Sequence, residues 1–171
     1  MMGIQAISEI LPGVPNVAVF DTAFHQSMKP ENFMYALPYE YYEKYGVRRY
    51  GFHGTSHKYV TSRVCEILGK DYASTRIINC HVGNGASVCA VANGRVVETS
   101  MWFTPLEGLV MGTRSWDLDP AVIKFIANTE GKSINEIDDI LNKKSGILGI
   151  SEISSDMRDV EDGFAKGDER C

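Results

Sequence analysis

The sequence lacks the features of secreted, membrane-spanning and nucleic-acid-binding proteins. Its four cysteines have no C-x-x-C spacing, which argues against a zinc site or a disulfide framework and favours reduced, cytoplasmic thiols. No apolar run reaches membrane-spanning length, and the first residues lack the basic and apolar regions of a signal peptide. A net charge of −5 argues against a broad nucleic-acid footprint. We therefore expect a cytoplasmic protein with neither a membrane nor a nucleic-acid partner.

Strand-like and helix-like patterns both occur along the 171 residues, and 44% hydrophobic content is enough for a core. A short apolar run predicts a buried strand at 16–20, and three antiparallel strands joined by tight turns are expected from about 77 to 100. Helices are predicted at 38–45, from Thr55 or Ser56 to a stop at Gly69, from Pro120 to a stop at Gly131, and from the capping-box sequence at 133–136. The expected core faces of the second and third helices are Val60, Val64, Ile67 and Leu68, and Val122, Phe125 and Ile126.

The stretch 76–92 has apolar runs on both sides of a polar, glycine-containing centre, His81 to Gly85. Gly83 and Gly85 permit positive φ and allow a ligand to approach the backbone, while Asn84 tolerates the left-handed region. Such a turn can present several N–H groups to a phosphate. A plain hairpin with an Asn-Gly turn is the other interpretation, and the dipeptide alone favours it.

Four further positions carry possible chemistry, each with a simpler alternative. Asp21 ends the predicted strand at 16–20 and is either a catalytic carboxylate or a cap or turn residue, with equal weight. His53 precedes a helix start, where free N–H groups favour anions, although a single histidine is more often structural. Arg114 can offer a planar fork to phosphate or carboxylate, or can simply brace its loop. The charged helix start at 154–159 can meet a nucleotide or only solvent.

Four motifs taken together resemble acetate kinase, in order and in separation: Phe20 to His25, Gly51 to His57, Asn79 to Gly85 and Phe103 to Gly108. That family belongs to the acetate and sugar kinase, Hsp70 and actin superfamily. The resemblance implies an α/β chain that is the central fragment of a two-domain actin-like ATPase (ribonuclease H-like) fold, with a mixed sheet flanked by helices. It also implies that residues 1–24 end the first domain and residues 25–171 begin the second, nucleotide-binding domain.

The resemblance further implies the role of each site residue. Asp21, His53 and Arg114 are expected in the catalytic site, the last two as stabilisers of the phosphoryl group in flight. The expected nucleotide contacts are His81, Val82, Gly83, Asn84, Gly85, Asp156, Met157 and Arg158. Phe52 and Pro105 are expected to line the pocket for the acetate methyl. The implied substrates are ATP and acetate with Mg²⁺ as cofactor, and the family assembles as homodimers.

As a central fragment, the chain would lack an N-terminal asparagine, an acetate-binding arginine and a magnesium-binding glutamate, so we expect no metal ligands in it and little activity alone. Three alternatives stay open: nucleotide or phosphate binding without catalysis, kinase activity on propionate or butyrate, and a fragment that does not fold. Trp102 and Trp116 stand where the resemblance implies glycine. Each is expected to lower stability by about 1–3 kcal/mol, and Trp116 to displace Arg114 or fill the phosphate site.

Overall fold

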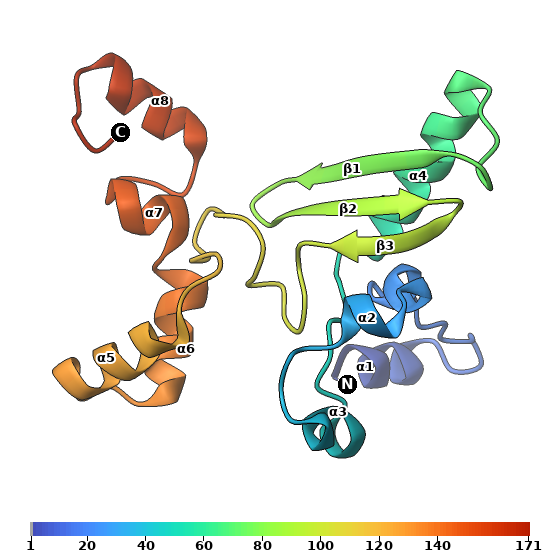
Figure 1. Ribbon diagram of the computed structural model, residues 1–171, viewed down its shortest axis with the longest axis horizontal. Coiled ribbons are helices and arrows are strands. Elements are labelled where there is room, and N and C mark those ends of the chain that lie inside the picture. The colour runs from blue at the N-terminus through green and yellow to red at the C-terminus, as the bar shows by residue number, and fades with distance from the viewer. Residues whose placement is uncertain (1) are drawn as a thin grey trace.

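The fold combines a three-stranded sheet and its helices with a separate run of helices at the C-terminal end (Figure 1). It is a computed structural model that describes residues 2–171. The elements in chain order are α1 Met2–Ile10, the 3-10 helix η1 Ala23–Ser27, α2 Pro30–Phe33, α3 Tyr39–Tyr45, α4 Gly54–Leu68, β1 Arg76–Val82, β2 Ala86–Ala92, β3 Arg95–Thr99, α5 Pro120–Glu130, α6 Ile134–Lys143, α7 Gly146–Ser151 and α8 Met157–Ala165.

The sheet confirms the three predicted strands, and the α/β class is confirmed with it. β1 pairs with β2 from Arg76 opposite Ala92 to Val82 opposite Ala86, and β2 pairs with β3 with a register shift at Ala90/Val91. Both pairings are antiparallel, so within residues 2–171 the sheet is antiparallel throughout, whereas a mixed sheet was expected. The hairpin between β1 and β2 points toward the C-terminal helices (Figure 1).

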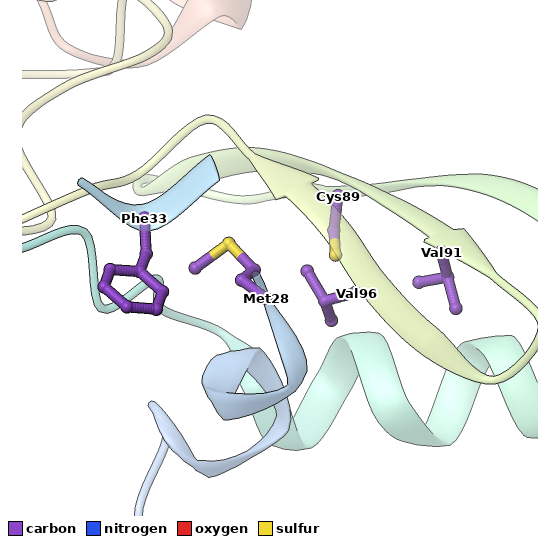
Figure 2. Close-up of a cluster of buried hydrophobic side chains, with 5 residues drawn as sticks. All are labelled: Met28, Phe33, Cys89, Val91 and Val96. Carbon is purple, nitrogen blue, oxygen red and sulfur yellow. The ribbon is translucent and has the colours of Figure 1, made fainter. Parts of the chain in front are cut away.

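The main apolar core lies under the middle of β2. Cys89, Val91 and Val96 project from β2 and β3 toward Met28 and Phe33 (Figure 2). All five are less than 9% exposed. A fully buried side chain of this size stabilises a fold by about 1.5–3 kcal/mol, so this cluster holds η1 and α2 against the sheet.

Helix α4 has the predicted stop at Gly69, but the prediction of its core face was wrong. Its buried residues are Gly54, His57, Thr61 and Cys65, while Ile67 and Leu68 are 65% and 63% exposed. The polar face is buried because the sheet supplies hydrogen bonds to it. The Asn79 side chain of β1 donates to the backbone oxygen of His57 at 3.0 Å and to the hydroxyl of Thr61 at 3.2 Å.

The predicted buried strand at 16–20 is not formed. This segment has no regular structure, and Val17 and Val19 are 83% and 77% exposed. A strand requires a neighbour for its backbone N–H and C=O groups, and no strand within residues 2–171 pairs with this one. Helix α1, which the sequence analysis did not predict, has no buried residue.

The caps of the later helices were predicted correctly. Asp119 accepts a hydrogen bond from the amide of Ala121, and Ser133 and Glu136 form the capping box. The predicted core face of α5 was wrong, because Val122 and Phe125 are exposed. None of the described helices is both long enough and apolar enough to cross a bilayer.

Candidate active site

Asp21 and His53 meet at the N-terminus of α4. The Asp21 carboxylate accepts hydrogen bonds from the backbone amides of His53 and Thr55, and the Asp21 carbonyl accepts one from the amide of Gly54 at 2.9 Å. A Cβ atom on Gly54 would lie 2.1 Å from that carbonyl oxygen, so only glycine fits. Asp21 therefore caps a helix that begins 33 residues later in the sequence, and it fixes the position of His53.

All four histidines of the sequence gather beside this helix start. The rings of His53 and His81 stack with centroids 4.0 Å apart, and His57 lies 5.9 Å from His25 and 6.4 Å from His53. Each of the four rings has a hydrogen-bond partner. His53 Nδ1 and His57 Nε2 each lie 2.8 Å from the Ser87 hydroxyl, and His81 Nδ1 lies 2.9 Å from the Ser56 hydroxyl. His25 Nε2 donates to the Phe52 carbonyl at 2.8 Å. The resemblance implied roles for His53 and His81, which the fold places together.

The environment favours the uncharged form of His53. Burial lowers the pKa of His53, and the neighbouring His81 lowers it further, while the charge of Asp21 opposes these effects. Burial also lowers the pKa of His57 to about 4. A neutral His53 can stabilise an anion by donating a hydrogen bond rather than by carrying a positive charge.

The loop at 83–85 needs its second glycine for space rather than for backbone conformation. None of its three residues has positive φ, although all three tolerate it. A Cβ on Gly85 would lie 2.9 Å from Arg114 Nη1 and 3.6 Å from His53 Nε2. The guanidinium and the imidazole therefore converge on the open face of Gly85.

The same loop has backbone amides free to bind a ligand. The Gly83 amide donates to the Gly85 carbonyl, and the Asn84 carbonyl accepts a hydrogen bond from Gly112 at 3.3 Å. The amides of Asn84 and Gly85 donate to no acceptor within residues 2–171. Two adjacent unpaired amides beside an arginine form a site suited to an anion.

Arg114 is held in place by the segment that precedes it. Its Nη1 donates to the Pro105 carbonyl at 3.0 Å and contacts the Met111 sulfur at 3.4 Å. Trp116 does not displace this guanidinium, contrary to the expectation. The Trp116 side chain is 48% exposed and borders a different cavity, of about 500 Å³, together with Trp102. Its backbone has φ of 79°, in the region that favours glycine.

A cavity of about 570 Å³ extends from the hairpin loop to the start of α8. Its lining includes Val82, Gly83, Asn84, Met111, Gly112, Asp156 and Met157. The fold thus brings Asp156 and Met157, two of the residues predicted to contact a nucleotide, to the loop. Arg158 does not line the cavity: its side chain is 87% exposed and pairs with Asp156. Phe52 packs against the buried cluster of Ala86, Met101 and Met111.

Sequence reasoning missed two features of this site. Ser87 is completely buried and contacts two histidines, yet it is an ordinary residue of a predicted strand. Met111 and Gly112 border the cavity from a segment without regular structure. Only the alternation of side chains along β2, which places Ser87 and Cys89 on one face, could have drawn attention to the serine.

The fold matches solved structures of kinases named for small carboxylates. A Porphyromonas gingivalis acetate kinase structure matches with a TM-score of 0.92 and 55% identity, covering 98% of this chain and 42% of that one. A Francisella tularensis propionate kinase structure matches with a TM-score of 0.94 and 48% identity, covering 99% and 43%.

The chain belongs to the acetokinase family, whose sequence pattern matches residues 1–171. Thermotoga maritima acetate kinase is 64% identical over 172 residues, which is all of this chain and 43% of that protein. Anoxybacillus flavithermus acetate kinase is 59% identical over 171 residues, again 43% of its length. The chain therefore spans less than half the length of the curated relatives it matches.

Proposed function

We propose that this chain supplies the central part of an acetate kinase, which transfers the γ-phosphoryl group of ATP reversibly to acetate. One observation carries the proposal: His53 Nε2 and Arg114 Nη1 converge on the open face of Gly85, beside a cavity large enough for a nucleotide. Arg114 is a cation and neutral His53 is a hydrogen-bond donor. Phosphoryl transfer to an acceptor that is already an anion requires such groups, because they stabilise the charge on the phosphoryl oxygens.

The reaction needs little proton abstraction. A carboxylate oxygen of acetate attacks the γ-phosphorus, the bond from that phosphorus to the β,γ-bridging oxygen breaks, and acetyl phosphate and ADP form. The Arg114 guanidinium and the N–H of neutral His53 would stabilise the charge on the phosphoryl oxygens. The free amides of Asn84 and Gly85 would hold the nucleotide phosphates, and Asp156 and Met157 would border the rest of the nucleotide.

Asp21 has a positioning role in this proposal. Its carboxylate already accepts the amides of His53 and Thr55, so it orients the helix start rather than acting as a free base. Residues 2–171 contain no group of three metal-ligating side chains. Magnesium would supply neutralisation of the nucleotide's phosphate charge, and the Asp21 carboxylate is the group that would help to hold it through water.

The remaining family properties belong to the same proposal. The full-length enzyme acts in the cytoplasm as a homodimer. Residues 1–24 end its first domain, and residues 25–171 begin its nucleotide-binding domain. Phe52 and Pro105 border the acetate methyl. Propionate is the second candidate acceptor, because the propionate kinase structure matches this fold as closely as the acetate kinase does.

Acetyl phosphate formation tests the proposal in two proteins. The first is the 171-residue chain alone, for which we expect almost no turnover. The second is a chimera in which residues 1–171 replace the matching segment of Thermotoga maritima acetate kinase, 64% identical to it. We expect the chimera to phosphorylate acetate faster than propionate. A folded chimera that binds ATP without phosphorylating either acid would contradict the proposed activity.

A further inference from the structure

We propose that Ser87 is a positioning residue that holds His53 in the tautomer with hydrogen on Nε2, so that the neutral ring presents an N–H to the transferred phosphoryl group. The inference concerns the site of the proposed function and rests on it for its catalytic meaning. The tautomer itself is a property of the chain, which can be measured without turnover.

The Ser87 hydroxyl lies between two imidazole rings. Its Oγ is 2.8 Å from His53 Nδ1 and 2.8 Å from His57 Nε2. Both Ser87 and His57 are completely buried. A hydroxyl has one hydrogen and can accept two hydrogen bonds. Within residues 2–171, Ser87 Oγ has no partner other than these two rings, so accepting from both would bury its own hydrogen without an acceptor. It therefore donates to one ring and accepts from the other, and the choice fixes both tautomers at once.

The surroundings of His57 favour one of the two arrangements. His57 Nδ1 is buried without a hydrogen-bond partner. If Ser87 donated to His57, that Nδ1 would carry a hydrogen with no acceptor, and buried N–H groups without a partner are rare in folded proteins. If Ser87 donates to His53 instead, His57 donates from Nε2 and its Nδ1 is a bare nitrogen, the less costly state.

The favoured arrangement determines which nitrogen of His53 carries the hydrogen. His53 Nδ1 accepts from Ser87, so its hydrogen lies on Nε2, the atom 3.6 Å from the Cβ position on Gly85. The opposite tautomer would aim a lone pair at the phosphoryl oxygens. Ser87 thus acts on the reaction only through His53.

Nitrogen-15 NMR of the ring nitrogens tests the tautomer directly in the 171-residue chain, which has only four histidines to assign. We expect His53 to show protonated Nε2 and bare Nδ1 at pH 7.5, and His57 to show the same pattern. Ser87→Ala should convert the His53 signals to an average of both tautomers, and Ser87→Thr, which keeps the hydroxyl, should restore them. Ser151→Ala, at another buried serine, is the matched control and should change neither ring.

Activity in the chimera supplies the second measurement. Ser87→Ala should lower kcat about tenfold with little change in KM for ATP, because a wrongly protonated histidine weakens the transition state rather than nucleotide binding. Ser87→Thr should recover most of it. A His53 ring protonated on Nδ1, or a Ser87→Ala ring with unchanged tautomer, overturns the proposal. An inactive parent chimera with the expected tautomer would instead refute the proposed function alone.

Discussion

The sheet body, residues 23–101, and the C-terminal helices, residues 120–165, are organised differently. The body buries apolar and polar side chains from distant parts of the sequence, including His25, Met28, His57 and Ser87. In the C-terminal helices, α5 has no buried residue, and α6 buries only Ile137 and Leu141. Phe125 and Phe164 are 67% and 72% exposed there. The body thus fixes its groups by tertiary contacts, and the C-terminal helices rely mainly on local ones.

This contrast divides the candidate site into two ends. His53 is fixed by Asp21 and Ser87, which lie 32 and 34 residues away in the sequence. Asp156, at the far side of the cavity, has only local hydrogen-bond partners within residues 2–171, namely Ser154, Arg158, Asp159 and Val160. We therefore expect the reacting end to be preorganised and the nucleotide end to adapt when it binds. Four experiments test this distinction.

The largest expected effect is on kcat of the chimera, and it should distinguish Arg114 from Arg158. Arg114→Ala should lower kcat for acetyl phosphate formation about a thousandfold, because Arg114 would neutralise charge on the phosphoryl group. Arg158→Ala should lower it less than about threefold, since Arg158 is exposed and pairs only with Asp156. Comparable losses in the two variants, measured by steady-state kinetics, would contradict the division of the site.

Acid should destabilise the body before the C-terminal helices. Burial lowers the pKa of His57 from 6.5 to about 4, so between these values the unfolded chain binds more protons than the folded one. The contribution of neutral His57 to the free energy of unfolding is complete above pH 6.5, and roughly 3 kcal/mol of it is lost as pH falls toward 4. Urea unfolding of the chain across this range measures the loss.

Two controls accompany the pH experiment. His57→Gln should weaken the pH dependence, because His57 is one of three histidines whose pKa burial lowers. Hydrogen exchange should show earlier loss of protection in β2 than in α6, since no histidine lies after His81. Equal loss in both regions would show that the histidine cluster does not carry the effect, and an unchanged pH dependence in His57→Gln would show that His57 does not.

The hairpin loop offers a matched pair of glycines. Gly85→Ala should lower kcat of the chimera about a hundredfold, because its Cβ would lie 2.9 Å from Arg114 Nη1 and move the guanidinium. Gly83→Ala places its Cβ 3.4 Å from the Gly85 carbonyl, an ordinary contact, and should change kcat little. If both variants lost the same activity, the loop would need flexibility rather than space at Gly85.

The smallest expected effect is on the stability of the chain, which the two tryptophan-to-glycine substitutions should change in opposite directions. Trp116→Gly should raise the stability of the chain by about 1 kcal/mol, because φ of 79° strains any residue with a Cβ. Trp102→Gly should lower it, because the Trp102 indole donates to the Thr99 carbonyl at 2.8 Å and lies 3.5 Å from the Arg49 guanidinium. Thermal unfolding compares them, and a gain in both variants would restore the expectation that each indole is harmful.

Local signals predicted the ends of many elements correctly. Gly46 and Gly69 end α3 and α4 in the left-handed conformation, and Asp119 and Ser133 cap α5 and α6. Each of these helix ends depends on hydrogen bonds between residues a few positions apart, so a short sequence pattern is enough to predict it. Two predictions that depended on distant parts of the chain were wrong: the run at 16–20 forms no strand, and α4 buries its polar face.

By itself, the sequence determined the three antiparallel strands, the helix caps and, through its motifs, the family and the residues expected at the site. The contacts that join those residues could be seen only in the folded chain. Asp21 caps a helix far along the chain, Gly85 leaves room for Arg114, and Ser87 joins His53 to His57. The reason is physical: a cap or a turn is satisfied within its own segment, whereas the direction of a shared proton depends on atoms that only the packed fold brings together.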